Sequence, residues 1–333
     1  MNKVIVLIVF ALVACDPKYK NTGTIPETPV NLVDINSEHD DYNSDLPISH
    51  GESFPLYFSS NRNSTFGLNF NIINKAFIIK YTPETGRLFV GEDPDSFRNP
   101  PDPGISNALN KLNTNYDELG PYIIDKVFSS KPGWEYTRYI FLYSSNEGGN
   151  QDIKFLHNLD DESYSNPQSV SFLNSPQDDA YPCVTADSSA MYFCSNRKGK
   201  FKIFKAGLNK NVSVLQNLED TSPKDIVEVT SLSSSADDKC PLIVNDVIVF
   251  VSNRAGGFGG FDLYYSILKN GEWSAPVNFG DKINSEYDEY RPFIKPMGKD
   301  FDNDFMIFSS NRPGGKGGFD LYYVGVPKSE QFQ

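Results

Sequence analysis

Pairs of adjacent carboxylates are the residues of this chain whose type and spacing best suit chemistry. Each pair closes a short string that begins with Ile or Leu and continues through small polar residues. The string occurs five times, and its pairs are Asp40–Asp41, Asp117–Glu118, Asp178–Asp179, Asp237–Asp238 and Asp288–Glu289. We refer to the two members of a pair as the first acid and the second acid. In the last four copies a proline stands three residues after the second acid.

Potential partners for these carboxylates follow in a second repeated string, an apolar run that ends in Ser-Asn-Arg. Its arginines are Arg62, Arg197, Arg254 and Arg312, whereas the second copy has Glu147 at this place. A planar guanidinium is well suited to pairing with a carboxylate. The last two copies continue through Gly-Gly-x-Gly-Gly to Asp262 and Asp320. Those two aspartates could accept N–H groups of the glycine turns, where glycine permits positive φ.

Two interpretations of the repeated residues remain. The first is structural: the acids, arginines and turn aspartates join neighbouring repeat units, because an active site is usually built only once. The second is functional: the acids form a rim around a channel mouth that attracts cations or basic partners. Glu147 breaks the pattern and marks the second unit as a candidate for a distinct local role.

Other chemistry is not indicated by the sequence. The three histidines lack the spacing of metal ligands, and there is no Gly-x-Ser-x-Gly elbow and no phosphate-binding loop. We therefore predict no catalytic residue, no metal site and no cofactor. Cys183 and Cys194 flank a predicted turn and should lie opposite each other on adjacent strands. Either a disulfide or two buried thiols would fit that arrangement, and Cys240 has no obvious partner.

The repeats predict an all-β fold in which each unit supplies one four-stranded antiparallel blade. The copies begin at residues 35, 112, 173, 232 and 283, and a propeller blade needs about 40–50 residues. Segment 63–111 contains a proline-rich stretch and is interpreted as an elaborated loop. The last unit lacks a fourth strand, but Thr28–Leu32 resembles the fourth-strand segment Ala275–Phe279. We therefore expect a five-bladed β-propeller over residues 28–327, with its last blade closed by the N-terminal strand.

These motifs resemble the WD-like propeller repeat of the TolB type, especially the versions found in envelope proteins of Bacteroidota. The resemblance covers nearly all of residues 28–326 and is strongest over 232–326. It is specific for the fold and a poor guide to function. TolB-like proteins act through protein–protein contacts, so the resemblance implies unidentified envelope proteins as partners.

The N-terminus indicates export. Residues 1–14 have a basic start and a short apolar core, as a secretory signal peptide does. Leu12–Cys15 is similar to the bacterial lipoprotein box, which implies that Cys15 is acylated and that residues 15–27 act as a tether. The expected location is the cell envelope, and the outer membrane is favoured over the inner.

The net charge of −13 argues against nucleic acid as a partner. The leading expectation is thus a lipid-anchored, non-catalytic module that binds or organises envelope proteins. The alternative is a carbohydrate-binding protein or a five-bladed glycoside hydrolase. A glycosidase would need two carboxylates that flank the scissile bond, placed outside the repeated positions together with aromatic platforms in a central pocket.

Overall fold

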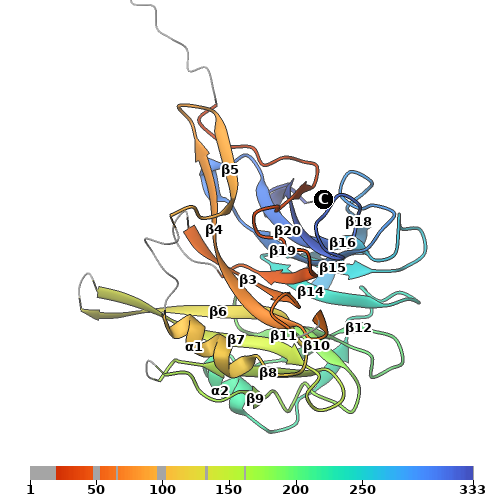
Figure 1. The fold of residues 1–333 in the computed structure, drawn as a ribbon. Coiled ribbons are helices and arrows are strands. Elements are labelled where there is room, and N and C mark those ends of the chain that lie inside the picture. Colours follow the sequence, from red (N-terminus) through yellow and green to blue (C-terminus); the bar gives the residue numbers. More distant parts are fainter. Residues whose placement is uncertain are drawn as a thin grey trace, which may run out of the picture.

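The computed structural model of the chain describes residues 20–47, 53–64, 67–95, 103–131, 134–160 and 163–332. They form five antiparallel sheets arranged around an axis, which confirms the predicted five-bladed β-propeller (Figure 1). The predicted signal peptide over residues 1–14 and the predicted lipid anchor at Cys15 lie outside the described residues.

Each blade begins with its innermost strand, at the axis, and proceeds outward. Blade one contains β2 (Asp41–Asp45), β3 (Ser53–Ser60), β4 (Asn71–Thr82) and β5 (Arg87–Glu92). Blade two contains β6 (Glu118–Lys131), β7 (Trp134–Ser145), β8 (Asp152–His157) and β9 (Gln168–Ser169). Blade three contains β10 (Asp179–Val184), β11 (Ala190–Ser195), β12 (Lys202–Gly207) and β13 (Ile226–Glu228).

Blade four contains β14 (Asp238–Val244), β15 (Val247–Ser252), β16 (Asp262–Lys269), β17 (Glu272–Trp273) and β18 (Val277–Asn278). Blade five contains β19 (Glu289–Lys295), β20 (Asp304–Ser310), β21 (Asp320–Val326) and β1 (Val30–Asn31). Helix α1 (Pro103–Leu112) precedes blade two, and α2 (Val214–Glu219) lies within blade three. Short 3₁₀ turns cover Gly298–Asp300 and Ser329–Gln331.

The second strand of a blade is packed on both faces. Every residue of β11, β15 and β20 is buried, and these strands are rich in Phe, Val, Ile and Met. Continuous apolar runs of this kind are typical of strands covered on both sides. The innermost strands contact one another in the ring β2, β6, β10, β14, β19 and back to β2. This ring surrounds the axis and positions the residues discussed below.

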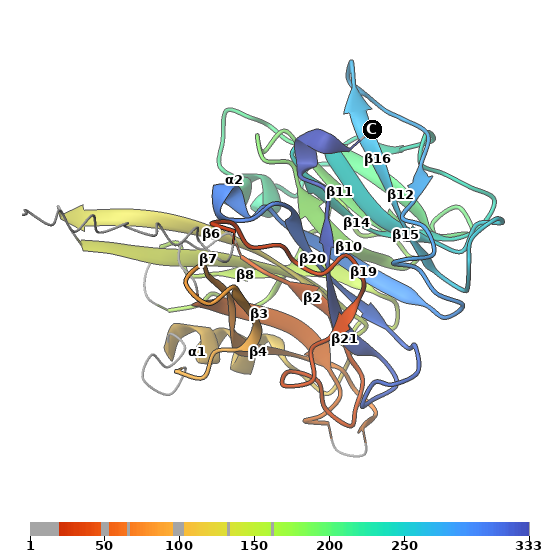
Figure 2. The ribbon, with the colours of Figure 1, turned by 90° about the horizontal axis from the view of Figure 1, so that it is seen from above.

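The N-terminal strand completes the last blade, as predicted. Val30 and Asn31 of β1 pair antiparallel with Tyr323 and Tyr322 of β21. The red N-terminal segment therefore runs beside the blue C-terminal strands (Figure 2). Closure of this kind leaves no free edge where the two ends of the ring meet.

All five innermost strands carry the same irregularity. Two residues after each second acid the backbone has positive φ, at Asn43, Gly120, Tyr181, Cys240 and Arg291. The register with the second strand shifts at the same place in every blade. Such a shift is a β-bulge, which bends a strand and redirects the side chains next to it.

Two sequence-based expectations need correction. Segment 63–111 is more than an elaborated loop, because it contains the two outer strands of blade one, β4 and β5, and then α1. Cys183 and Cys194 do not face each other: Cys183 pairs with Tyr192, and Cys194 pairs with Ala180. The bulge at Tyr181 and a turn one residue nearer the N-terminus than expected cause this shift.

The cysteines of the described region are free and buried. Burial, together with the nearby Cys194 thiol of the preceding blade, raises the pKa of the Cys240 thiol. Burial raises the pKa of the Cys194 thiol to about 11 and that of Cys183 to about 12.

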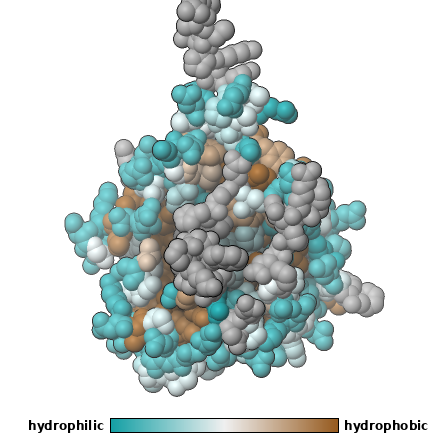
Figure 3. Space-filling view, turned by 90° about the vertical axis from the view of Figure 1, so that its left-hand side faces the viewer, coloured by the Kyte–Doolittle hydropathy of each residue, from teal (hydrophilic) through white to brown (hydrophobic). Residues whose placement is uncertain are grey.

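The surface of the molecule is mixed in character. On the face shown in Figure 3, hydrophilic residues predominate and hydrophobic ones form separate patches. The hairpin of β6 and β7 projects from the body of the propeller (Figure 2). Within the described residues, no helix combines the length and the apolar character needed to cross a membrane.

Candidate functional site

The second acids are buried at the start of the innermost strands. In four of the blades, the second acid forms an ion pair with an arginine of the same blade. The pairs are Arg62–Asp41 at 2.5 Å, Arg197–Asp179 at 2.6 Å, Arg254–Asp238 at 2.7 Å and Arg312–Glu289 at 2.8 Å. Each arginine also donates to the carbonyl of the residue that opens the repeated string, such as Ile35 or Ile283. These contacts hold the incoming loop of a blade against its second strand.

The first acids link neighbouring blades. One oxygen of each accepts a backbone N–H from the blade before it, in the pairs Asp40–Phe319, Asp117–Phe70, Asp178–Gln151, Asp237–Phe201 and Asp288–Phe261. The other oxygen accepts the side-chain amide of the repeated asparagine in three blades, at Asn146, Asn196 and Asn311. The first acids therefore use their oxygens in hydrogen bonds that connect neighbouring blades of the ring.

The aspartates after the glycine turns are likewise held within the fold. Asp262 accepts the N–H groups of Phe258 and Gly259, and Asp320 accepts those of Lys316 and Gly317. Both aspartates are 1% exposed. The turns thus supply donors to a buried carboxylate, and neither aspartate is accessible to a ligand.

Blade two has no arginine for its second acid. The carboxylate of Glu118 accepts hydrogen bonds from the Thr114 backbone, the Thr114 hydroxyl and the Ser145 hydroxyl. Glu147, at the arginine position, pairs with Lys154. Burial raises the pKa of Glu118 from 4.5 to about 7.

The axis itself is lined by residues that differ from blade to blade. One residue after each second acid stand Tyr42, Leu119, Ala180, Lys239 and Tyr290, which line one mouth of the channel. Tyr181, Phe201, Phe319, Gln151 and Asp178 complete a cavity of about 390 Å³ there. We call this cavity the tyrosine mouth. None of its lining residues except Asp178 belongs to the repeated set named from the sequence.

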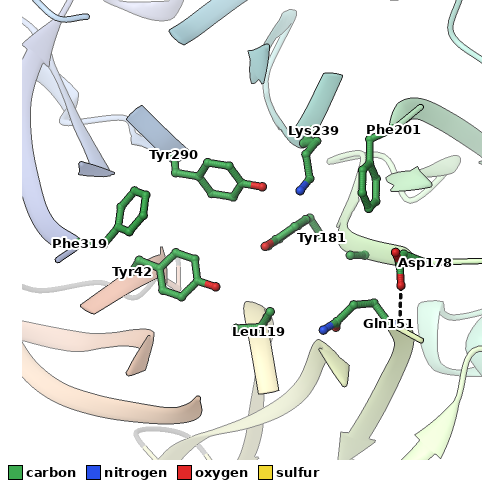
Figure 4. Close-up of a pocket in the computed structure, with 10 residues that line it drawn as sticks. Tyr42, Leu119, Gln151, Asp178, Tyr181, Phe201, Lys239, Tyr290 and Phe319 are labelled. Atoms are coloured by element: carbon green, nitrogen blue, oxygen red, sulfur yellow. Dashed lines mark hydrogen bonds between the residues drawn. The ribbon is translucent and has the colours of Figure 1, made fainter. Parts of the chain in front are cut away.

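The tyrosine mouth combines aromatic faces with polar groups. The phenol groups of Tyr42, Tyr181 and Tyr290 and the ammonium of Lys239 converge on one space (Figure 4). The Lys239 nitrogen lies 4.2 Å from the Phe201 ring centroid and 5.4 Å from that of Tyr290. Burial raises the pKa values of the Tyr42 and Tyr290 phenols above their ordinary range, so both hydroxyls keep their protons.

Below this mouth, the bulge residues fill the axis. The Arg291 guanidinium stacks over the Tyr181 ring at 5.5 Å and donates to the Pro121 carbonyl at 3.0 Å. The Asn43 amide donates to the Tyr181 hydroxyl at 3.4 Å. Gly120 leaves room for the same tyrosine ring, because a Cβ there would lie 2.3 Å from it. These residues separate the tyrosine mouth from the other end of the channel.

A second cavity, of about 340 Å³, occupies that other end. Its lining includes Asp45, Tyr122, Asp125, Phe293 and Lys295, and we call it the Asp45 mouth. Burial raises the pKa of Asp45 to about 7, with Arg291 acting in the opposite direction. Asp45 accepts the Ile123 N–H through Oδ2, while Oδ1 has no hydrogen-bond partner in the described part of the chain.

Sequence reasoning missed both mouths because it followed the repeated residues. The signal was available in the positions that vary at a fixed offset from the second acid. Asp45 is one such residue, since its equivalents are Tyr122, Cys183, Leu242 and Phe293. Among the described residues, no group of three or more His, Cys, Asp or Glu side chains is placed to hold a metal ion.

Comparisons with known proteins reveal the fold. No family model matches the chain, and no curated protein matches it. The catalytic domain of a GH62 α-L-arabinofuranosidase from Coprinopsis cinerea is similar over 92% of this chain and 97% of its own, with 10% identity and a TM-score of 0.51. An α-L-arabinofuranosidase from Podospora anserina, solved with cellotriose, is similar over 92% and 98%, with 12% identity and a TM-score of 0.50.

A TolB structure from Agrobacterium tumefaciens is similar over 84% of this chain and 75% of its own, with 12% identity and a TM-score of 0.37. At these identities the comparisons show the fold and no family membership.

The comparisons also correct two expectations from the sequence. The leading expectation, a non-catalytic protein-binding scaffold, is wrong, because the two arabinofuranosidases named above match this chain over 92% of its length. The prediction that the chain is not an enzyme is wrong for the same reason. The repeated motifs led to both errors, because their residues join the blades, whereas the residues that line the axis lie mostly outside these motifs. What the chain shares with these hydrolases is the five-bladed propeller.

Proposed function

We propose that this chain is a carbohydrate-active protein and that it binds sugar in the tyrosine mouth. The observation that carries the proposal is the cavity at the axis, where three tyrosines, Phe201 and Lys239 converge (Figure 4). Sugar rings present apolar C–H faces that pack on aromatic rings, and their hydroxyls need fixed hydrogen-bonding partners. A concave pocket with aromatic walls and a few converging polar groups meets both needs.

Binding can be tested on an array of neutral and acidic oligosaccharides, with affinities then measured by calorimetry. Phe201→Ala removes an aromatic wall of the tyrosine mouth and should weaken binding about tenfold, as loss of a stacked ring does. Phe258→Ala is the matched control, because Phe258 is 49% exposed on a glycine turn outside the mouth. The proposal fails if no oligosaccharide binds, or if both variants bind as the unaltered chain does.

A second function, glycoside hydrolysis at the Asp45 mouth, is favoured by a separate observation. Asp45 and Asp125 both line this cavity, and neither belongs to the repeated acids. Glycosidases use two carboxyl groups, one of which is held protonated near neutral pH. Asp45, whose pKa burial raises to about 7, would be the protonated partner, and Asp125 would be the second carboxyl group.

Release of reducing sugar from arabinose- and xylose-containing glycans tests this second function. Asp45→Asn and Asp125→Asn should each lower the rate by about 100-fold or more, the size of effect that general acid–base groups usually have. Asp281→Asn, which changes an exposed aspartate away from both mouths, should leave the rate unaltered. Equal rates in all three variants would remove hydrolysis at this mouth from consideration.

For location, we propose an exported lipoprotein held to the outer membrane through Cys15. The first described residues support a simple orientation. Gly23 bridges to Phe301, in the connection from β19 to β20 that follows the Lys295 rim of the Asp45 mouth. Gly23, the described end from which a tether would run, therefore lies on the Asp45 side, and the tyrosine mouth lies at the opposite end of the axis. Radiolabelled palmitate incorporation that is lost in Cys15→Ala tests the anchor.

A further inference from the structure

Lys239 brings a positive charge into the tyrosine mouth. It is carried by β14, and aromatic rings surround its ammonium, with Phe201 at 4.2 Å, Tyr290 at 5.4 Å and Phe261 at 5.8 Å. Within the described residues, the Lys239 nitrogen forms no ion pair, because no carboxylate oxygen lies within 4.0 Å of it. Aromatic faces stabilise an ammonium, but they accept no conventional hydrogen bond, so its three N–H groups stay available to a ligand.

Further donors point into the same space. The Asn43 amide donates to the Tyr181 hydroxyl, which leaves that O–H group free to donate. The nitrogen of the Gln151 side-chain amide faces the cavity in Figure 4. Its oxygen is buried with no partner among the described residues.

Acceptors in the mouth are few. Asp178 is its only acidic lining residue, and both of its oxygens are engaged, by the Gln151 N–H and by the Asn196 amide. A cavity with an unpaired ammonium, and with its one carboxylate engaged, is complementary to a ligand that carries acceptors. An anionic acceptor gains most, because hydrogen bonds to charged groups are roughly twice as strong as neutral ones.

We propose that the tyrosine mouth selects a carboxylate-bearing sugar, a hexuronic acid, whose carboxylate pairs with Lys239. The inference rests on the proposed sugar binding at this mouth and specifies the class of sugar. The pyranose ring would pack on the aromatic wall, while Tyr42 and Tyr181 donate to its oxygens. The net charge of −13 opposes the approach of an anion and acts mainly on the association rate. The direct contact with Lys239 provides the selectivity.

Calorimetry on the full chain can test this choice with three matched probes: galacturonic acid, its methyl ester and galactose, together with the corresponding glucose series. We expect the acid to bind at least about tenfold more tightly than its ester or the neutral sugar, a gain of about 1.4 kcal/mol. Lys239→Met keeps the unbranched stem on Phe201 and should abolish that preference. Lys239→Arg should retain it, and Lys210→Met, at an exposed lysine paired with Asp187, should not alter it.

The outcomes separate the two proposals. If the neutral sugars bind but the acids bind no more tightly, or if Lys239→Met keeps the preference, the inference is overturned while sugar binding stands. If none of the probes binds but neutral oligosaccharides on the array do, the mouth does not select hexuronic acids. If neither array nor calorimetry detects binding, both proposals fail together.

Discussion

At the scale of single residues, the arginine pairing of the second acids is interrupted only in blade two among the described pairs. Asp41, Asp179, Asp238 and Glu289 each have an arginine, whereas Glu118 relies on two hydroxyls and a backbone N–H. All five carboxylates are fully buried. A buried carboxylate without a cation shifts toward its neutral form, which explains the raised pKa of Glu118.

Glu147→Arg should therefore stabilise the protein at alkaline pH. Since the pKa of Glu118 rises from 4.5 unfolded to about 7 folded, the folded chain holds a proton that the unfolded chain has released. The resulting stabilisation is present below pH 4.5 and is lost as pH rises through 7. A neighbouring arginine would stabilise the charged carboxylate and reduce this loss. Thermal melts at pH 5 and pH 8 should show a higher Tm at pH 8 and little change at pH 5.

The control for that change is Glu147→Gln, which removes the exposed pair with Lys154 without supplying a cation. Exposed pairs of this kind contribute about 0–1 kcal/mol, so the glutamine variant should melt close to the unaltered chain. If Glu147→Gln raised the Tm at pH 8 as much as Glu147→Arg, the missing arginine would not be the cause.

Removing the arginine from blade five should lower the stability of the protein. Arg312→Met leaves the buried Glu289 carboxylate without its cation while keeping much of the side-chain packing over Phe308. Breaking one partner of a buried pair typically costs about 3–5 kcal/mol. Urea denaturation measures this loss, with Lys210→Met as the exposed-pair control. A loss as small as that of the control would show that the arginines matter little to the blades.

At the scale of elements, the bulge in the innermost strands decides what reaches the axis. The Tyr181 ring occupies the space beside Gly120 of the neighbouring blade, where φ is +58°. The Gly120 N–H donates to the Ser59 hydroxyl, and the Tyr181 N–H donates to that of Ser144, in each case on the preceding blade. The bulges are thus tied to the neighbouring blades as well as shaped by their own strands.

Gly120→Ala should destabilise the protein by about 2–4 kcal/mol, because positive φ penalises a Cβ and the added atom would overlap a ring. That atom would lie 2.3 Å from Tyr181 Cδ1. Gly207→Ala at the end of β12 is the control, because a Cβ there meets nothing within 4 Å. Equal urea midpoints for the two variants would contradict the packing described here.

The strands also show how much of the fold could be predicted from the sequence. The repeated strings predicted five blades and the closing strand, because both depend on contacts that recur in every unit. They did not predict β4 and β5, since these two strands of blade one carry none of the repeated strings. The partner of Cys183 was misplaced because the turn lies one residue nearer the N-terminus than expected, and the bulge beyond Cys183 shifts the partner of Cys194 as well.

The candidate site was less predictable than the fold for a physical reason. Residues that join blades must satisfy the same geometry five times, and they are therefore repeated. Residues that bind a ligand on the axis face one ligand from five directions, so they differ. Lys239 and Tyr290 occupy equivalent positions in adjacent blades. Aligning the repeats to find variable positions next to constant ones would have identified this mouth.

At the scale of the whole molecule, the ring depends on a joint between the two ends of the chain. The hydrogen bonds at this joint are the same as those between the outer strands of blade four. Asn31 donates to Asp320 at 2.8 Å, as Asn278 donates to Asp262 at 2.8 Å in blade four. A second asparagine backs each of these, Asn36 at the chain ends and Asn284 in blade four.

The last prediction concerns the strength of this joint. The N-terminal segment is also held upstream of β1, where Thr22 and Thr24 donate to Asp302 and the Ile25 N–H donates to Asn303. A terminal strand clamped on both sides should behave as a continuous one. Asn31→Ala should therefore cost as much in urea denaturation as Asn278→Ala, about 1–3 kcal/mol each for the lost hydrogen bonds. A much smaller loss for Asn31→Ala would mean that the terminal strand detaches before the ring unfolds, and that the blades hold together without closure.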